Sequence, residues 1–308
     1  MITSGQAHGK IILIGEHAVV YGQPAITIPL LDIVTNVTVQ ETQTQTTINS
    51  KYYQGALLKA PQELQGIVAL VQLLLKDLPI TTNVSINITS DLPIERGMGS
   101  SAATGAAITK ALFKYSNTTL NNEKLLYYTN FSEKIIHGTP SGVDAVTVNS
   151  QQPIYFIKDQ LTEAFTTNLQ GYLIIIDSGI KGNTGQAVHD LRVFKQQHPA
   201  IVNPKITQLG RLTVQTKSAL QQQNLTQLGL IFHTAQQLLH DLKISLPILE
   251  RLIDIANQNG SLGTKITGGG RGGCLIALTS DQASAQTIAT AVKASGAKQT
   301  WIQPLQQS

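Results

Sequence analysis

The chain has 308 residues, of which 42% are hydrophobic, and it carries a formal charge of +4 at pH 7. This length allows one large domain or two, and the apolar share excludes a disordered chain. The 22 basic residues form no run that resembles a nucleic-acid-binding arm, so a small phosphorylated ligand explains the positive charge as well as a nucleic acid does.

The cysteine count and the first residues of the chain give an indication of the cellular compartment. Cys274 is the only cysteine, which excludes an intramolecular disulfide and a cysteine-cluster metal site and is consistent with a reducing compartment. The first ten residues lack a charged segment followed by an apolar core, and no apolar run nears the roughly 18 residues of a membrane span. We therefore expect a cytoplasmic protein without a membrane partner.

The first half of the chain is predicted to be rich in strands. Alternating or continuous β-branched and apolar residues indicate strands at residues 10–14, 25–39, 84–88, 146–148 and 154–157. Apolar residues spaced three and four apart, or runs of alanine, indicate helices at residues 64–78, 102–113 and 122–136.

The second half is predicted to be more helical. Helices are expected at residues 188–195, 204–221, 225–242, 247–258 and 283–294. Strands are expected at residues 172–176, 265–267 and 274–278, with a last one near Trp301. Since no linker or repeat marks a boundary, we place it between residues 160 and 185, which gives domains 1–170 and 171–308.

A glycine segment, Gly97-Met98-Gly99-Ser100-Ser101, stands between a predicted strand and a predicted helix. Glycines allow a ligand to approach the backbone, and a helix N-terminus favours an anion, so a phosphate would be held here. A hydroxyl can also coordinate Mg²⁺ beside a phosphate. The alternative is an ordinary tight turn in which Ser100 caps the helix.

Several common nucleotide-binding and catalytic motifs are missing. The only Gly-Lys pair is Gly9-Lys10, so the chain has no Walker A loop. The spacing G-x-G-x-x-G occurs at residues 268–273, but between two predicted strands and not before a helix, so the dinucleotide fingerprint fits no better. The protein-kinase signatures H-R-D and D-F-G, the metalloprotease motif H-E-x-x-H and the hydrolase motif G-x-S-x-G do not occur.

Two carboxylates flank a second glycine-containing segment. Glu133 lies late on a predicted helix, and Asp144 follows the loop of residues 137–142. This spacing can turn both carboxylates toward one cavity, one as a metal ligand and one facing a hydroxyl. Alternatively, Glu133 is solvated on the helix surface and Asp144 caps a turn.

Charged side chains near the start and a third glycine loop near the end are weaker signals. Lys10, Glu16 and His17 offer a cation, a carboxylate and an imidazole, although a lysine at a strand end is usually just exposed. The loop 268–273, with Arg271 in its midst, separates two predicted strands. So many glycines there suggest that something approaches the backbone closely, or else a flexible hairpin.

Four segments occur in an order that resembles the GHMP family of small-molecule kinases. They are residues 10–22 (KIILIGEHAVVYG), 97–103 (GMGSSAA), 137–144 (HGTPSGVD) and 265–274 (KITGGGRGGC). The resemblance implies an α+β fold of two domains, with a left-handed β-α-β unit in the N-terminal domain, a C-terminal ferredoxin-like domain and an active site between them. Residues 95–98 (Glu-Arg-Gly-Met), Arg271 and His8 depart from the common pattern of the family, and the sequence assigns Arg96 and Arg271 no role.

The resemblance also implies roles for individual residues. Asp144 would take the proton of the substrate hydroxyl beside Lys10, and Ser101 and Glu133 would bind Mg²⁺. The residues implied to bind ATP are Pro93, Gly97, Met98, Gly99, Ser100, Ser101, Ala102 and Ala103. Those implied to bind the substrate are Glu16, His17, Gly269 and Gly270.

The first and third of these segments most resemble the branch of the family that acts on mevalonate. This implies direct in-line phosphoryl transfer from ATP to mevalonate, with Mg²⁺, in a protein that forms a homodimer and binds no nucleic acid. Rivals within the family are kinases for phosphomevalonate, homoserine or a sugar, and an ATP-dependent diphosphomevalonate decarboxylase. Outside it, the alternative is a basic nucleic-acid-binding or regulatory module that keeps the glycine loops only as structure.

Overall fold

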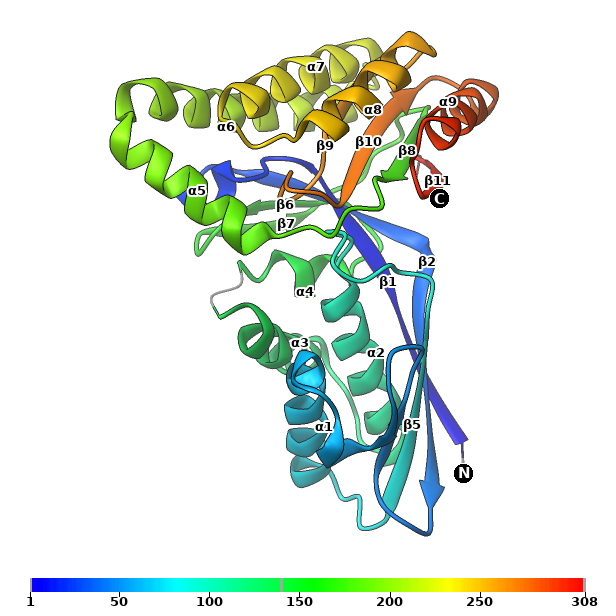
Figure 1. The fold of residues 1–308 in the computed structure, drawn as a ribbon. Coiled ribbons are helices and arrows are strands. Elements are labelled where there is room, and N and C mark those ends of the chain that lie inside the picture. The colour runs from blue at the N-terminus through cyan, green and yellow to red at the C-terminus, as the bar shows by residue number, and fades with distance from the viewer. Residues whose placement is uncertain (1, 139–140, 307–308) are drawn as a thin grey trace. The chain divides into compact units, whose positions relative to one another are not determined.

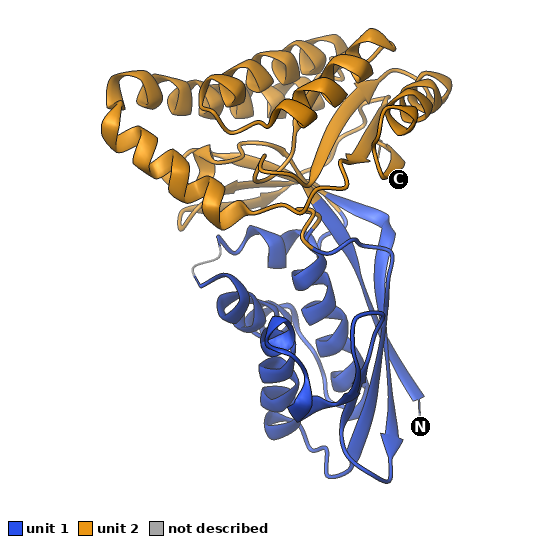
Figure 2. Cartoon of the chain, viewed as in Figure 1, with its two compact units in different colours: residues 1–10, 29–94, 99–151 blue, residues 11–28, 95–98, 152–308 orange. Residues whose placement is uncertain are grey.

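The computed structural model describes residues 2–138 and 141–306, which form two compact units (Figure 2). Unit 1 contains residues 1–10, 29–94 and 99–151, and unit 2 contains residues 11–28, 95–98 and 152–308. Each unit is thus assembled from separate stretches of the chain. The contiguous domains 1–170 and 171–308 stay a prediction.

In unit 1 the strands follow the order β4-β3-β5-β2, and β1 also pairs with β2. They are β1 (Ile2–Ile14), β2 (Ala25–Thr42), β3 (Thr47–Asn49), β4 (Gln54–Ala56) and β5 (Asn83–Ser90). β3 is parallel to β5, whereas β2 is antiparallel to β5 and β3 to β4. The left-handed connection expected in this unit stays a prediction.

The helices of unit 1 pack beside these strands (Figure 1). They are α1 (Gln65–Asp77), α2 (Ser100–Tyr115), α3 (Asn122–His137) and the short α4 (Val143–Thr147). Small residues let α2 lie close to its neighbours: a Cβ on Gly5 of β1 would come within 2.2 Å of Ala107 O, and one on Gly105 within 2.8 Å of Ser132 Oγ of α3. Close packing on two sides therefore fixes the position of α2 and of its N-terminus.

Unit 2 is built on a four-stranded antiparallel sheet in the order β11-β8-β10-β9. Its strands are β8 (Tyr172–Asp177), β9 (Gly263–Ile266), β10 (Cys274–Thr279) and β11 (Gln299–Pro304). Its helices are α5 (Thr184–Gln197), α6 (Pro199–Gln221), α7 (Leu225–Asp241), α8 (Pro247–Gln258) and α9 (Gln282–Ala294). With β8 counted first, the strand order is 4-1-3-2 and the helices fall after the first and third strands, which confirms the expected ferredoxin-like domain.

Unit 2 also contains the ends of two strands that begin or continue in unit 1. Within it, residues 25–27 of β2 pair with β6 (Ile154–Ile157), and β6 pairs with β7 (Leu161–Ala164). The described residues also form three single-turn 3₁₀ helices: η1 (Ala18–Tyr21) in unit 2, and η2 (Leu57–Lys59) and η3 (Gln62–Leu64) in unit 1.

One predicted element is wrong, and one predicted helix begins earlier than expected. Residues 146–148 were expected to form a strand, but Val143–Thr147 is the helix α4. Although its residues are partly β-branched, Thr147 Oγ1 donates to Val143 O and Asn149 Nδ2 to Ala145 O, so side chains satisfy carbonyls of a single helical turn. Helix α6, expected to begin at Pro204, begins at Pro199: this proline occupies the first turn, where no N–H partner is needed, and the helix continues through Pro204.

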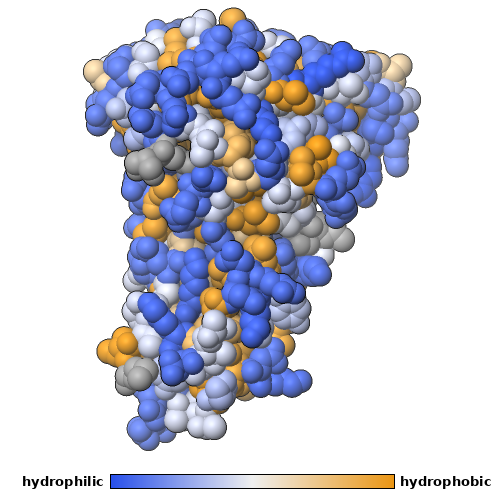
Figure 3. Space-filling view, turned by 180° about the vertical axis from the view of Figure 1, so that it is seen from behind, coloured by the Kyte–Doolittle hydropathy of each residue, from blue (hydrophilic) through white to orange (hydrophobic). Residues whose placement is uncertain are grey.

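Two features of the structure concern contact with a membrane: the length and apolar character of the described helices, and the hydropathy of one face. Within residues 2–138 and 141–306, no helix combines the length and the apolar character needed to cross a bilayer. The face drawn in Figure 3 is mostly hydrophilic, with hydrophobic residues in small separate groups. Such scattered apolar groups are normal on a protein surface.

Replacing Gly229 of α7 by alanine should destabilise unit 2. A Cβ there would lie 2.5 Å from Leu262 O, a backbone atom just before β9. Overpacking of this kind costs about 1–3 kcal/mol. In the matched control, Gly185→Ala in α5, the new Cβ meets only Asn183 Oδ1 at 3.8 Å, and the better helix propensity should add up to about 1 kcal/mol. Urea unfolding of both variants checks this; equal midpoints would contradict it.

Candidate active site

The N-terminus of α2 is capped by Gly99, whose backbone is left-handed at φ 73°. A Cβ at this position would lie 2.8 Å from Lys10 Cγ, so only glycine lets the lysine stem pass here. Ser100 is the first helical residue and not the cap, which removes the alternative reading of this segment as a serine-capped turn. The first N–H groups of α2 therefore have no side-chain cap, and the positive end of the helix dipole favours an anion.

Lys10 and Asp144 form an ion pair beside this cap. Lys10 Nζ, on β1, lies 2.9 Å from Asp144 Oδ1, on the first turn of α4. The lysine side chain is only 4% exposed, whereas the aspartate side chain is 32% exposed. The lysine is thus held in place under the protein surface, while the carboxylate remains open to a ligand.

Glu133 of α3 is a second carboxylate in the same group of residues. It is 2% exposed, and burial raises its pKa to about 7, with the negative charge of Asp144 adding to the effect. A hydrogen bond from Ser101 and the charge of Lys10 act in the opposite direction. His137 Nε2 lies 3.7 Å from Glu133 Oε2 and 3.4 Å from Ser101 Oγ.

The donors around Glu133 fit a magnesium ion that also binds phosphate. Glu133 Oε1 is buried without a hydrogen-bond partner, and a buried carboxylate oxygen left in this way is stabilised by a cation. Among the described residues, no three histidine, cysteine or acidic side chains form a metal cluster. Mg²⁺ commonly takes one or two carboxylates and completes its shell with phosphate oxygens and water, so Glu133 and the Ser101 hydroxyl suffice on the protein side.

The other residues expected to bind the nucleotide can offer mainly their backbone. Gly97 is exposed with φ 77°, whereas Met98 is buried and Pro93 half-buried. Ala102 and Ala103 are fully buried, with their side chains in the core of unit 1. An anion at the start of α2 would therefore meet N–H groups and the serine hydroxyls.

In unit 2, Glu16 forms an ion pair with a lysine that the sequence did not single out. Glu16 Oε1 is bonded to Lys265 Nζ, and both side chains are 0% exposed. Lys265 Nζ also donates to Ile266 O at 2.6 Å. Burial raises the pKa of Glu16, and Lys265 counteracts this shift. Its carboxylate faces Lys265, and its expected role in binding substrate stays a prediction.

The signal for Lys265 was present in the sequence. A lysine inside a short strand that continues into a glycine loop needs a partner if the strand is buried. The partner stands 249 positions away in the chain, and spacing alone does not reveal it.

His17 follows Glu16 and is held against the third glycine loop. Its Nε2 lies 3.1 Å from Gly269 O, and burial lowers its pKa to about 4, with the charges of Arg271 and Lys265 contributing. The ring is neutral at pH 7, so Nε2–H donates to the carbonyl and Nδ1 is left as a buried acceptor without a partner. His17 also adopts a positive φ of 58°, which is uncommon for a residue with a side chain.

The loop 268–273 is packed and not a flexible hairpin. A Cβ on Gly269 would lie 2.8 Å from Thr184 Oγ1, and one on Gly270 would lie 2.6 Å from Ile244 Cγ2. The glycines therefore let this loop lie directly on α5 and on the chain near Ile244. Gly269 and Gly270 are buried by this packing, and their contact with substrate stays a prediction.

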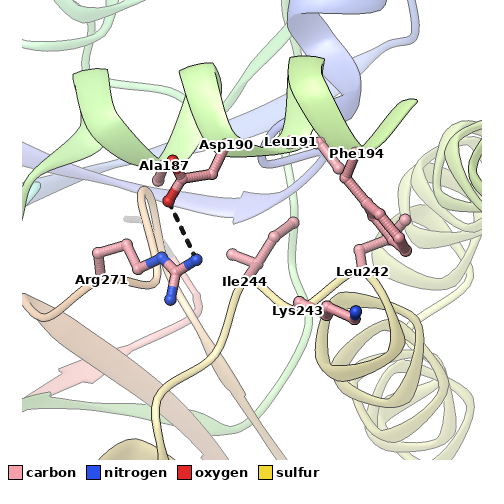
Figure 4. Close-up of a pocket in the computed structure, with 8 residues that line it drawn as sticks. All are labelled: Ala187, Asp190, Leu191, Phe194, Leu242, Lys243, Ile244 and Arg271. Carbon is pink, nitrogen blue, oxygen red and sulfur yellow. Dashed lines mark hydrogen bonds and ion pairs between the residues drawn. The ribbon is translucent and has the colours of Figure 1, made fainter. Parts of the chain in front are cut away.

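A small cavity of about 110 Å³ adjoins this loop in unit 2 (Figure 4). Arg271 points into it and donates from Nη2 to Asp190 Oδ2 of α5 at 3.1 Å. The remaining lining is Ala187, Leu191, Phe194, Leu242, Lys243 and Ile244. Arg271 thus ties the glycine loop to α5.

The structure brings together part of the expected site within each unit. In unit 1, Lys10, Gly99, Ser101, Glu133 and Asp144 form one cluster. In unit 2, His17 and the loop that contains Gly269 are in contact. Thr139 and Pro140, in the loop before Asp144, lie outside the described residues.

The buried His17 should make the stability of the chain fall with acidification between pH 6.5 and 4. Between these pH values His17 is protonated in the unfolded chain and neutral in the folded chain. The unfolding free energy therefore decreases by up to about 1.4 kcal/mol per pH unit, or about 3 kcal/mol in all. His17→Gln keeps a donor for Gly269 O but does not titrate. Urea unfolding from pH 7 to pH 4 should show a smaller loss in the variant; parallel profiles would refute the assignment.

Two family models match the chain and together cover most of the motifs described above. The GHMP kinases N terminal domain matches residues 65–150, and the GHMP kinases C terminal domain matches residues 216–298. These ranges fall mainly in unit 1 and unit 2, respectively.

Individual relatives agree with the family models. The mevalonate kinase of Pyrococcus abyssi is 27% identical over 94% of this chain and 92% of its own length, and that of Saccharolobus solfataricus is 28% identical over 92% of each. The crystal structure of mevalonate kinase from methicillin-resistant Staphylococcus aureus is 32% identical, has a TM-score of 0.80 and covers 99% of both chains. The L. major enzyme in complex with R-mevalonate has the same fold, with a TM-score of 0.86 at 24% identity over 99% of this chain and 96% of that chain. The chain therefore belongs to the GHMP kinase family, in its mevalonate kinase branch.

Proposed function

We propose that the chain transfers the terminal phosphoryl group of ATP to the terminal hydroxyl of mevalonate, giving 5-phosphomevalonate on the mevalonate route to isoprenoids, with Mg²⁺ as cofactor. The observation that carries this proposal is the cluster in unit 1, where Asp144 and Lys10 lie beside a glycine-capped helix N-terminus and a buried Glu133. Membership of the family supports the reaction type. The names of the relatives, and the L. major complex with R-mevalonate, support the substrate.

The nucleotide phosphates would be held at the start of α2. The N–H groups of its first turn lack side-chain caps, and Gly97 and Gly99 both have positive φ, which brings backbone rather than side chains to the ligand. Ser101 and Glu133 would hold Mg²⁺, which when bound neutralises charge on the phosphate oxygens. The start of α2 would thus bind the phosphates, and Ser101 and Glu133 would hold the Mg²⁺ that balances their charge.

Asp144 would accept the proton of the attacking hydroxyl. Lys10 binds its Oδ1, which fixes the orientation of the carboxylate, and Oδ2 would then face the substrate. The charge of Lys10 would also stabilise the oxygens that gain negative charge during transfer. Because phosphoryl transfer needs little covalent chemistry from the protein, this positioning should carry most of the rate, with no phosphorylated enzyme intermediate.

Glu16, His17, Gly269 and Gly270 are proposed to form the mevalonate pocket in unit 2. His17 Nδ1, a buried acceptor without a partner, suits a hydroxyl donor of the substrate. Glu16 would act through its ion pair with Lys265, because this pair fixes Glu16 and thereby helps to position the adjacent His17. A homodimer and a cytoplasmic location stay predictions.

ADP release by the purified protein tests the proposed reaction. Mevalonate with Mg²⁺ and ATP should support turnover, and the same mixture without mevalonate should not. Phosphomevalonate, homoserine and galactose serve as competing acceptors, and diphosphomevalonate tests the decarboxylase alternative. Turnover with one of these instead of mevalonate would replace the proposed substrate, and oligonucleotide binding that weakens with salt, without any turnover, would replace the function.

Asp144→Asn should lower turnover by roughly 10² to 10⁴, because an amide cannot accept the hydroxyl proton. The matched control is Asp32→Asn, since Asp32 is an exposed aspartate on β2 in the same unit. Steady-state ADP release with saturating mevalonate and ATP measures both. Unchanged turnover in the Asp144 variant would remove this residue from the mechanism.

Glu133→Gln should raise the Mg²⁺ concentration required for half-maximal activity by roughly tenfold or more, because an uncharged amide is a weaker ligand than a carboxylate. Glu123→Gln, at the exposed start of the same helix, is the control and should leave the requirement unchanged. Activity is measured against Mg²⁺ at fixed ATP, and removal of the ion with EDTA should abolish it in all variants. Identical Mg²⁺ curves for the two variants would argue against Glu133 as a ligand.

A further inference from the structure

A buried ion pair in unit 2 has no part in the proposed chemistry. Arg96 directly precedes Gly97, and its Nε lies 2.8 Å from Asp177 Oδ1 at the end of β8. Arg96 is 8% exposed and Asp177 is 2% exposed. Two charges this deeply buried are retained only where hydrogen bonds satisfy them, so their partners indicate what the pair holds together.

The partners of the pair close the turn that follows β8. Asp177 Oδ1 also accepts from Gly179 N at 2.8 Å, and Arg96 Nη2 donates to Gly179 O at 3.0 Å. The planar guanidinium reaches the carboxylate and the carbonyl at once, which a lysine could not do with the same rigidity. Arg96 is therefore bound at two points to one short stretch of chain.

Backbone contacts join this turn to two glycine segments. We call residues 95–98, 178–182 and 272–273 the three-loop cluster. Gly182 N donates to Glu95 O at 2.7 Å, Gly273 N donates to Ile180 O at 2.8 Å, and Ser178 N donates to Gly273 O at 3.1 Å. A Cβ on Gly273 would lie 2.9 Å from Arg96 O, so the loops touch backbone to backbone.

The three-loop cluster is attached to an inner strand of the sheet of unit 2. Asp177 stands in register between Cys274 of β10 and Gln299 of β11, and β8 is an inner strand of the sheet. Residues 95–98 belong to this unit, although the residues on either side of them in the chain belong to unit 1. Residues 95–98 are held in this position by the buried side chain of Met98 and by the ion pair of Arg96.

We propose that Arg96 is a positioning residue for nucleotide binding: it clamps the first part of the phosphate loop, Gly97 and Met98, to the end of β8, so that their N–H groups are already oriented before ATP arrives. The guanidinium is turned to Asp177 and takes no direct part in the reaction. This inference rests on the proposed function, because it assigns the loop to ATP. It predicts that ATP affinity depends on Arg96 separately from stability.

The test separates positioning from stability with a double variant. Arg96→Met leaves Asp177 buried and unpaired, so this variant should lose both thermal stability and ATP affinity. Adding Asp177→Asn removes the buried charge while its Oδ1 can still accept from Gly179 N, so the melting temperature should largely recover. If the clamp orients the loop, the KM for ATP stays raised by about tenfold in both variants, whereas kcat changes by less than about threefold.

Two further readouts complete the test. Amide hydrogen exchange of the peptide covering residues 95–99, in the absence of nucleotide, should be faster by about tenfold in the double variant than in the parent chain. Lys205→Met, which breaks the more exposed Lys205–Asp241 pair of unit 2, is the control and should change neither KM nor this exchange.

The outcomes are distinct. Recovery of the KM for ATP and of the exchange rate together with the melting temperature would show that Arg96 only stabilises the fold and would overturn the inference. A parent chain without ATP turnover would refute the proposed function instead, and the exchange experiment would still decide whether Arg96 clamps the loop.

Discussion

The missing side chain at Gly99 is the constraint on which the cluster in unit 1 depends. Gly99 has a left-handed backbone and no Cβ. It caps the N-terminus of α2 and leaves room for the aliphatic stem of Lys10. The lysine can then reach Asp144 while remaining almost fully buried. Any other residue here would strain the backbone and displace the lysine, so helix cap and ion pair depend on the same position.

Two buried ion pairs help to hold the loops of unit 2. Glu16 is paired with Lys265, and Arg96 with Asp177, and all four side chains are buried. The loops concerned are rich in glycine and have little apolar surface to bury. A buried charge with one correct partner fixes a loop in one position, at the expense of the desolvation of both groups. This arrangement suits loops that must stay ordered around a small ligand.

Much of the fold could be predicted from the sequence because its patterns are local. The spacing of apolar residues predicted α1 and α7 closely, and the continuous apolar run at residues 172–176 predicted β8. The short strands β3, β4 and β7 were missed, since three or four residues carry too little periodicity. The strand predicted at residues 146–148 was wrong because side-chain hydrogen bonds to carbonyls of α4 outweighed the β-branched composition.

The residues of the candidate site could likewise be predicted only in part. Lys10, Ser101, Glu133 and Asp144 stand in recognisable motifs, and the structure brings them together. Lys265 and Asp177 stand in strands whose neighbours are apolar, and their partners are distant in the chain, so only the folded structure shows their pairing. The burial of Glu133, which sets its pKa, also follows from packing that the sequence does not contain.

The full burial of Ala102 and Ala103 has a consequence for selectivity. In the proposed function, the start of α2 would meet its ligand with N–H groups and two serine hydroxyls, which recognise the charge and shape of a phosphate chain and nothing of the nucleobase attached to it. Discrimination between adenine and guanine would then come from another part of the molecule. Evolution could alter the preferred nucleoside triphosphate there without disturbing the start of α2.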